Sequence, residues 1–198
     1  MTARRFGVLA LQGAVPEHLR ALEAVGAEPV AVKWPQDLDG LTGLILPGGE
    51  STTIGDLMVH YGFIDAIRRW VQNGGAVYGT CAGAILMATE ILGGKPNQPR
   101  LAIMPITIQR NGFGRQVNSC EVPLSMPVLG PEPVHTVFIR APYIARVGSG
   151  VEVLAEYDGK IVAARYGRHL ATAFHPELTE DRRIHKLFVE MALAAVAV

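Results

Sequence analysis

Hydrophobic residues occur in this chain as short continuous runs rather than in strict alternation with polar residues. Three such runs, at 6–11, 28–33 and 41–46, lie near the start of the chain, and the turn residues Gln12-Gly13 and Pro47-Gly48-Gly49 follow the first and the third. Strands that are covered by helices on both faces have this pattern. Three buried strands of a parallel sheet are therefore predicted.

Apolar residues at helical spacing lie between and after these runs. One helix is predicted to begin near Pro16 and to end at Gly26, because proline suits a first helical turn and glycine suits a helix stop. A second is expected to begin among the hydroxyl residues at 51–53, and a third at 64–71, before Asn73-Gly74-Gly75. Strands that alternate with helices predict an α/β domain with a mostly parallel sheet.

The stretch 76–86 carries the most chemical information. A short apolar strand runs into Gly79-Thr80-Cys81-Ala82-Gly83, and helix formers follow as far as Leu92. This is the layout of a nucleophile elbow, with Cys81 at its apex in place of serine. The N-terminus of the following helix would favour a thiolate and any oxyanion beside it. A buried structural cysteine in a glycine-rich turn is the alternative.

The second half of the chain is richer in strands. Its candidates are 103–109, 116–122, 136–140, 151–157, 161–166 and 169–173. Turn signals such as Asp158-Gly159 indicate that some of them are antiparallel and pair at an edge of the main sheet. A final helix is expected to begin at Thr179-Glu180-Asp181. The chain is predicted to be one three-layer α/β domain over residues 1–198, since no linker or repeat divides it.

Composition excludes several classes of protein. The chain has 198 residues, of which 49% are hydrophobic and 18% charged, and its 18 basic residues balance its 18 acidic ones. A nucleic-acid binder would carry a basic excess, so none is expected as a partner. Two cysteines and the lack of a signal peptide or an apolar run of about 18 residues predict a cytoplasmic protein outside the membrane. No motif indicates a metal or a dinucleotide, and we expect no cofactor.

A cysteine nucleophile needs a base, and His175 is the best placed of the six histidines. It leaves a strand whose carboxyl end is expected at the same edge of the sheet as the elbow. Glu177 follows two residues later and can orient the imidazole. His18, His60 and His185 fall in helical patterns and are expected to be exposed or packed, and His135 and His169 have no clear catalytic placement. The predicted triad is Cys81, His175 and Glu177.

The loop Pro47-Gly48-Gly49-Glu50-Ser51 can supply the remaining part of the site. An oxyanion hole needs two N–H donors that point to one place, and a glycine pair presents an N–H without a side chain in the way. Our hypothesis is that Gly49 and Ala82 are these donors. An ordinary turn in which Ser51 caps a helix is the alternative, and the two are compatible. Arg110 and Arg140 are either substrate ligands or ordinary solvated surface arginines.

Taken together, these motifs resemble the class I, triad-type glutamine amidotransferases, and among them the glutaminase subunits of pyridoxal 5'-phosphate synthase. The class motifs are Gly79-Thr80-Cys81-Ala82-Gly83 and His175-Pro176-Glu177. The narrower resemblance rests on segments spread in order over nearly the whole chain, namely 11–15 with Glu17-His18, 46–52, 110–116, 138–142 and 174–181.

The resemblance implies that Cys81 is a nucleophile, with His175 and Glu177 completing the triad. It also implies a role for the Gly-Glu-Ser loop and the two arginine segments in holding L-glutamine, through the residues Gly49, Glu50, Ser51, Arg110, Ile139 and Arg140. Ammonia from glutamine would pass to a synthase subunit, in a large hetero-oligomer, that combines a pentose phosphate with a triose phosphate. The chain would need no bound cofactor for this work.

The resemblance also implies dependence on the partner. A peptide flip at Gly48-Gly49 is a plausible switch because glycine can flip without a steric penalty, and residues 12–18 are the candidate partner contact. Gly112 departs from the larger residue expected there, which predicts a more mobile loop. The competing functions are a glutaminase subunit that serves another synthase, a Cys-His peptidase or stress protein of similar fold, and a non-catalytic binding module.

Overall fold

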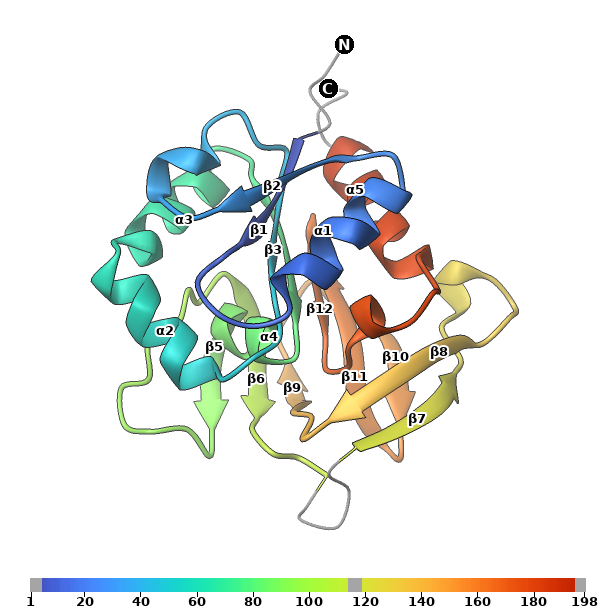
Figure 1. Cartoon of the computed structure of the whole chain (residues 1–198). Coiled ribbons are helices and arrows are strands. Elements are labelled where there is room, and N and C mark those ends of the chain that lie inside the picture. The colour runs from blue at the N-terminus through green and yellow to red at the C-terminus, as the bar shows by residue number, and fades with distance from the viewer. Residues whose placement is uncertain (1–4, 114–118, 195–198) are drawn as a thin grey trace.

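The computed structural model describes residues 5–113 and 119–194, and Figure 1 shows a central sheet with helices on both faces. Five parallel strands form one half of this sheet, in the order β2-β1-β3-β4-β12. They are β1 (Arg5–Leu9), β2 (Glu28–Val32), β3 (Gly43–Leu46), β4 (Ala76–Thr80) and β12 (His169–Thr172). These are the continuous apolar runs of the sequence, together with the last predicted strand.

The sheet continues from β12 through β11, β9, β6 and β5, and β10 pairs with β11 alone. The bounds are β5 (Ala88–Leu92), β6 (Met104–Gln109), β9 (Tyr143–Val147), β10 (Val151–Tyr157) and β11 (Lys160–Tyr166). Each neighbouring pair here is antiparallel except β5 with β6. A separate antiparallel hairpin joins β7 (Ser119–Leu124) to β8 (Val134–Ile139).

Two layers of helices cover the sheet, each over its own apolar core. On one face lie α2 (Ser51–His60), α3 (Phe63–Gln72) and α4 (Ala82–Met87), whose buried side chains include Met58 and Phe63. On the other lie α1 (Val15–Ala24) and α5 (Arg183–Ala194), where Phe188 packs against Phe6 and Tyr78. Short 3-10 turns at Pro35–Leu38, Pro127–Leu129 and Pro176–Leu178 complete the connections.

The register of the parallel strands brings the predicted catalytic segments to one edge of the sheet. Leu46, at the end of β3, is paired with Gly79, and Thr80 is paired with Thr172 at the end of β12. The Gly48-Gly49 loop, the elbow and the His175 segment therefore leave three adjacent strands at the same level. This is the crevice outside the carboxyl ends of the strands where ligands bind in open α/β sheets.

The structure confirms the predicted α/β fold with a mostly parallel sheet and antiparallel strands beside it. It also corrects three element predictions. The helix after the elbow ends at Met87 instead of Leu92, because residues 88–92 adopt the extended backbone of β5 and pair with β6. The β-branched Thr89 and Ile91 favour a strand there.

The second correction concerns the last helix, which begins at Arg183 instead of 179–181. Thr179 and Asp181 use their side-chain oxygens in a local turn, accepting from the backbone N–H groups of Asp181 and Arg183. The third is β9, which the sequence did not predict. Of the expected strand at 116–122, residues 116–118 lie outside the described residues.

Within residues 5–113 and 119–194, no helix is both long enough and apolar enough to cross a lipid bilayer.

Candidate active site

Cys81 lies at the apex of a sharp strand-to-helix turn, as the pentapeptide predicts. Its backbone has φ 49° and ψ −104°, an unusual conformation for a residue with a side chain. A Cβ at Gly83 would overlap the carbonyl oxygen of Leu46, and one at Gly79 would overlap the backbone at Gly83. Both glycines are therefore required by close backbone contact. The Cys81 N–H donates to the carbonyl of Thr172 at 2.8 Å, which ties the apex to β12.

His175 and Glu177 form the pair that the sequence predicts. Nδ1 of His175 lies 2.7 Å from Oε1 of Glu177, and the side chains are 10% and 0% exposed. The backbone N–H of His175 donates to the carbonyl of Val137, which fixes this segment against β8. Since Nδ1 is engaged with Glu177, Nε2 is the ring nitrogen available for chemistry in the pocket.

The surroundings of His175 favour its charged form. Burial alone would lower the pKa of His175, but hydrogen bonds and charge interactions with Cys81 and Glu177 outweigh burial and raise it to about 10. At neutral pH the ring is therefore an imidazolium between a sulfur and a carboxylate. This is the arrangement that supports a cysteine nucleophile.

A pocket of about 430 Å³ opens above Cys81 and His175. Twelve of the described residues line it, namely Gln12, Gly49, Glu50, Ser51, Cys81, Ala82, Ile85, Arg110, Asn111, Ile139, Arg140 and His175. The structure thus brings together every predicted site residue except Glu177, which lies buried behind His175. Gln12, Ile85 and Asn111 are lining residues that the sequence reasoning did not assign to the site.

The two predicted oxyanion donors flank the pocket from separate loops. Ala82 is the first residue of α4, directly after Cys81, and Gly49 lies in the loop after β3. Within the described residues, neither N–H donates to a protein acceptor. The carbonyl of Gly48 accepts from the Ala14 N–H at 3.2 Å, so the orientation of the Gly48–Gly49 peptide is coupled to the start of α1.

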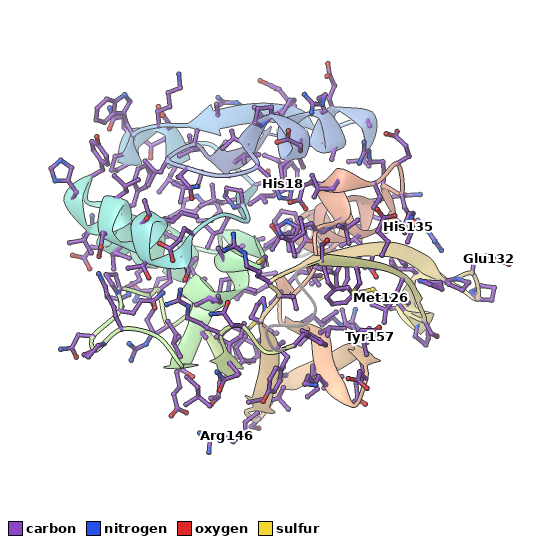
Figure 2. All side chains as sticks on the ribbon, turned by 60° about the horizontal axis from the view of Figure 1, so that its bottom comes forward. His18, Met126, Glu132, His135, Arg146 and Tyr157 are labelled. Carbon is purple, nitrogen blue, oxygen red and sulfur yellow. The ribbon has the colours of Figure 1, made fainter. Side chains whose placement is uncertain are left out.

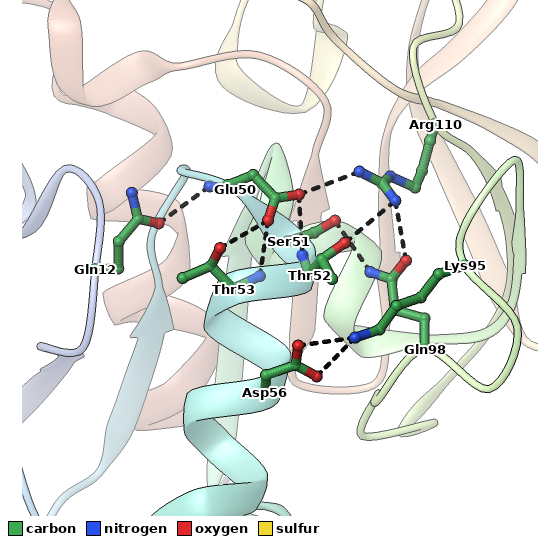
Figure 3. A network of polar contacts seen from close by, with 9 residues as sticks. All are labelled: Gln12, Glu50, Ser51, Thr52, Thr53, Asp56, Lys95, Gln98 and Arg110. Atoms are coloured by element: carbon green, nitrogen blue, oxygen red, sulfur yellow. Dashed lines mark hydrogen bonds and ion pairs between the residues drawn. The ribbon is translucent and has the colours of Figure 1, made fainter.

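Glu50 is the centre of a polar network at the rim of the pocket (Figure 3). Its carboxylate caps α2 by accepting from the N–H groups of Thr52 and Thr53. Burial would raise the pKa of Glu50, but these hydrogen bonds outweigh it and lower the pKa. The helix cap is therefore Glu50, and the alternative reading in which Ser51 caps α2 is wrong, because the Ser51 hydroxyl accepts from Gln98 instead.

Arg110 is held in the same network from three sides. Its guanidinium donates to Glu50 at 3.2 Å, to Gln98 at 3.1 Å and to Thr52 at 3.4 Å (Figure 3). Gln98 is buried and connects Arg110 to Ser51. This fixes the Arg110 side chain at the pocket before any ligand binds. The role of Gln98 was not predicted, since its loop carries no sequence motif and only the fold brings it here.

The other predicted residues on this side come from β8 and the loop after it. Ile139 ends β8, and Arg140 follows with φ 42°. Gly112 donates its N–H to the carbonyl of Ala141, and a Cβ there would overlap the ring of Tyr143. The close approach of Tyr143 gives a steric reason for glycine at this position. Of the neighbouring motif, residues 114–116 lie outside the described residues.

Within residues 5–113 and 119–194, no group of three or more His, Cys, Asp or Glu side chains could hold a metal ion. Cys120 lies in β7 as a free cysteine. His169 is buried at the start of β12, where its Nδ1 accepts the Val77 N–H, and burial lowers its pKa to about 4.

Comparison with known proteins gives an independent view of the chain. It matches the SNO glutamine amidotransferase family over residues 8–194. It is 53% identical to the pyridoxal 5'-phosphate synthase subunit PdxT of Moorella thermoacetica over 94% of this chain and 98% of that protein. The PdxT of Niallia circulans is 57% identical over 94% and 97%. A crystal structure of a glutamine amidotransferase superposes with a TM-score of 0.89 at 52% identity, covering 94% and 98% of the two chains.

Proposed function

Because the chain belongs to the SNO glutamine amidotransferase family, we propose that it hydrolyses L-glutamine to L-glutamate and ammonia, as the glutaminase subunit of pyridoxal 5'-phosphate synthase. The relatives named above, at 53% and 57% identity, are subunits of that synthase. A peptidase, a stress protein or a binding module finds no support among them. The same holds for a glutaminase that serves another synthase.

One observation carries the proposal. An imidazole that is held at 2.7 Å by a buried carboxylate interacts with Cys81 at the base of a pocket lined by the other predicted residues. A structural cysteine would have no need of the His175–Glu177 pair. The strained backbone at Cys81 is a further cost that function explains better than packing does.

In the acylation step, the sulfur of Cys81 attacks the side-chain amide carbon of glutamine. The tetrahedral oxyanion accepts hydrogen bonds from the N–H groups of Gly49 and Ala82. His175, as an imidazolium, donates its Nε2 proton to the leaving nitrogen. The carbon–nitrogen bond breaks, ammonia leaves, and a γ-glutamyl thioester remains on Cys81.

The thioester is then hydrolysed by water. Neutral His175 accepts a proton from the water through Nε2 while Glu177 stabilises the imidazolium that forms. The new oxyanion rests on the same two N–H groups. Its collapse breaks the carbon–sulfur bond and releases glutamate, and the sulfur and the imidazolium return to their starting state.

The rim of the pocket suits the charged end of free glutamine. Arg110 and Arg140 are cations that would bind the α-carboxylate, and Glu50 is an anion that would bind the α-ammonium group. The Gly49, Ser51 and Ile139 positions would contact the remainder of the substrate. Because Glu50 and Arg110 are already fixed to each other and to α2, little side-chain order has to be gained on binding.

The partner is proposed to be the synthase subunit, in a large hetero-oligomer, that uses ammonia with a pentose phosphate and a triose phosphate. The proposed switch is the Gly48–Gly49 peptide. A flip would break the bond between the Ala14 N–H and the Gly48 carbonyl, which is worth about 1 kcal/mol. Partner contact at residues 12–18 would act directly on that bond, since Ala14 lies in the segment and Gln12 accepts the Glu50 N–H.

The test is ammonia and glutamate release from glutamine, measured for wild type and Cys81→Ala with and without the synthase subunit. We expect low release by the isolated wild type, a strong rise with the partner, and none from Cys81→Ala. Absence of glutamine hydrolysis by wild type with the partner would overturn the function. Full turnover by the isolated chain would overturn the switch.

A further inference from the structure

Two buried histidines lie behind the triad, on the side away from the pocket. His18 is on α1 and His185 is on α5, and both are fully buried between the helices and the sheet. Figure 2 shows His18 on the side of α1 that faces the interior, whereas Glu132 and Arg146 lie at the periphery. Neither histidine lines the pocket. His18 is the last residue of the 12–18 segment, but its side chain is fully buried and is not available for a partner contact.

His18 approaches the oxygen of Glu177 that His175 does not use. Oε1 of Glu177 is bonded to His175, while Oε2 lies 3.6 Å from Nε2 of His18. Within the described residues, this Oε2 is buried and has no hydrogen bond. The same Nε2 of His18 lies 3.1 Å from the hydroxyl of Thr80, the residue before Cys81. His18 therefore contacts both the acid of the triad and the elbow.

The charge of Glu177 selects one tautomer of His18. A proton on Nε2 presents a positive N–H to Thr80 and Oε2, whereas a proton on Nδ1 would turn a lone pair toward the carboxylate. With Nε2 protonated, Nδ1 of His18 is free to accept, and Nε2 of His185 lies 3.0 Å away as its donor.

The same assignment accounts for an unpaired atom on His185. Its Nδ1 is buried without a partner within the described residues. If Nε2 of His185 carries the proton, this Nδ1 is a bare acceptor. This assignment leaves a lone pair of His185, and not an N–H group, without a partner.

A second cation beside Glu177 is disfavoured. Burial lowers the pKa of His18 well below its usual value, and electrostatic interactions with His185, His175 and Arg182 lower it further. Burial and then Arg182 lower the pKa of His185 to about 3. One buried carboxylate compensates the imidazolium of His175, and the two histidines behind it stay neutral.

We propose that His18 is a positioning residue for the triad: its Nε2–H restrains the free oxygen of Glu177, and His185 maintains the tautomer of His18 that allows this. The hydrogen bond from His175 holds Oε1, and the partial positive charge of the His18 N–H, whose nitrogen lies 3.6 Å from Oε2, attracts Oε2 without a hydrogen bond. Oε1 therefore stays at bonding distance from His175 while the ring gains and loses its proton. This inference rests on the proposed glutaminase reaction.

The consequence is a specific kinetic signature. Without His18, Glu177 can rotate its carboxylate, and His175 loses the orientation that both chemical steps need. Misplacement of a catalytic group by about 1 Å can cost on the order of 10²-fold in rate. Because His18 is remote from the pocket, glutamine binding is unaffected. We expect kcat to fall and KM to stay the same.

The first experiment measures kcat and KM for glutamine of His18→Leu and His18→Gln, each in complex with the wild-type synthase subunit. His18→Leu should lower kcat by about 30- to 100-fold with KM within about threefold of wild type. His18→Gln keeps an N–H donor near the position of Nε2, and its kcat should be at least about tenfold higher than that of His18→Leu. His169→Leu is the matched control, because it removes another buried imidazole that has no contact with Glu177. It should lower the melting temperature and leave kcat and KM near wild type.

Several outcomes would overturn the proposal: wild-type kcat in His18→Leu, no recovery in His18→Gln, or the same kinetic loss in His169→Leu. If wild type in complex with the synthase subunit releases no ammonia, this would instead overturn the proposed glutaminase function.

The second measurement needs no variant, and it decides the matter if His18→Leu does not fold. Nitrogen-15 NMR of the imidazole rings in the wild-type chain reports the tautomer of each histidine. At pH 7, we expect His18 and His185 both to be neutral and protonated on Nε2. A proton on Nδ1 of His18, or a charged His18, would contradict the proposal.

Discussion

Replacing Glu177, the acid of the proposed triad, by its amide tests how much of the chemistry depends on charge. Glu177→Gln keeps the size of the side chain and can still place an acceptor 2.7 Å from Nδ1 of His175, but it removes the negative charge. The native surroundings raise the pKa of His175 from 6.5 to about 10. This corresponds to a net preference of roughly 5 kcal/mol for the imidazolium over the neutral ring. Cys81 and Glu177 together provide it, after the cost of burial has been subtracted.

A hydrogen bond to a charged group is worth about 1.5–3 kcal/mol, and the charge of Glu177 is expected to contribute roughly that much. The amide can also turn its NH₂ toward Nδ1 and select the wrong tautomer of the ring, which adds to the loss. We therefore expect kcat to fall on the order of 10³-fold, or roughly 4 kcal/mol. KM should stay within about threefold of wild type, because Glu177 does not line the pocket.

The assay is ammonia release from glutamine in the presence of the synthase subunit, with thermal unfolding of each variant as the check on folding. Glu180→Gln is the matched control. Glu180 lies three residues further along, and its side chain is fully exposed beside Arg182. It should behave as wild type. A folded Glu177→Gln protein with kcat within about threefold of wild type would refute the electrostatic role of Glu177.

Three further predictions follow from other contacts. Gly48→Ala would place a Cβ 2.9 Å from Nδ1 of His175, so kcat should fall about 100-fold without loss of circular dichroism, and an unchanged kcat would contradict this packing. Gln98→Leu removes an acceptor that holds Arg110; steady-state kinetics should show KM for glutamine rising about tenfold with little change in kcat, and an unchanged KM would argue against a substrate role for Arg110. Below pH 6.5 the unfolded chain protonates three histidines that the fold keeps neutral, namely His18, His169 and His185. As the pH falls, each should lower the free energy of unfolding by up to roughly 1.4 kcal/mol per pH unit, down to about pH 4. His175, which is already charged in the fold, should offset part of this fall mainly above pH 6.5, because below that value the unfolded chain also carries the proton. Urea unfolding at pH 7 and 5.5 should show that the free energy of unfolding falls less in His169→Gln than in wild type. Equal stability of wild type at the two pH values would contradict the conclusion that the fold keeps these histidines neutral.

Local patterns were sufficient to predict most of the strands, the elbow and most of the lining of the pocket, but not β5 or β9. The continuous apolar runs predict β1, β3 and β4, which are buried because helices cover both faces. The run at 28–33 also forms a strand, but the prediction that it is buried was wrong, because β2 is the edge strand and only Val32 of it is buried. The glycines at 79 and 83 predict a tight turn, and the structure shows the overlaps that exclude a side chain there. His175 and Glu177 are close in sequence, so their pairing required no knowledge of the fold.

The remaining features depend on contacts between distant segments. His18 meets His185 only because α1 and α5 pack on the same face of the sheet, and Gln98 meets Arg110 only through the fold. Strand β5 replaced the end of a predicted helix because it pairs with β6, and its β-branched residues suit that extended backbone. Glu50 occupies the N-cap position that the alternative interpretation gave to Ser51, and its carboxylate accepts from two N–H groups at once.

The central claim is that Cys81 carries the glutamyl group, and a covalent intermediate tests it most directly. Wild type with the synthase subunit would be mixed with glutamine, quenched in acid within the first turnovers and measured by intact-protein and peptide mass spectrometry. The predicted result is one γ-glutamyl group on the peptide that contains Cys81, with neither adduct nor ammonia from Cys81→Ala. Glutamine hydrolysis by Cys81→Ala at the wild-type rate would contradict the account.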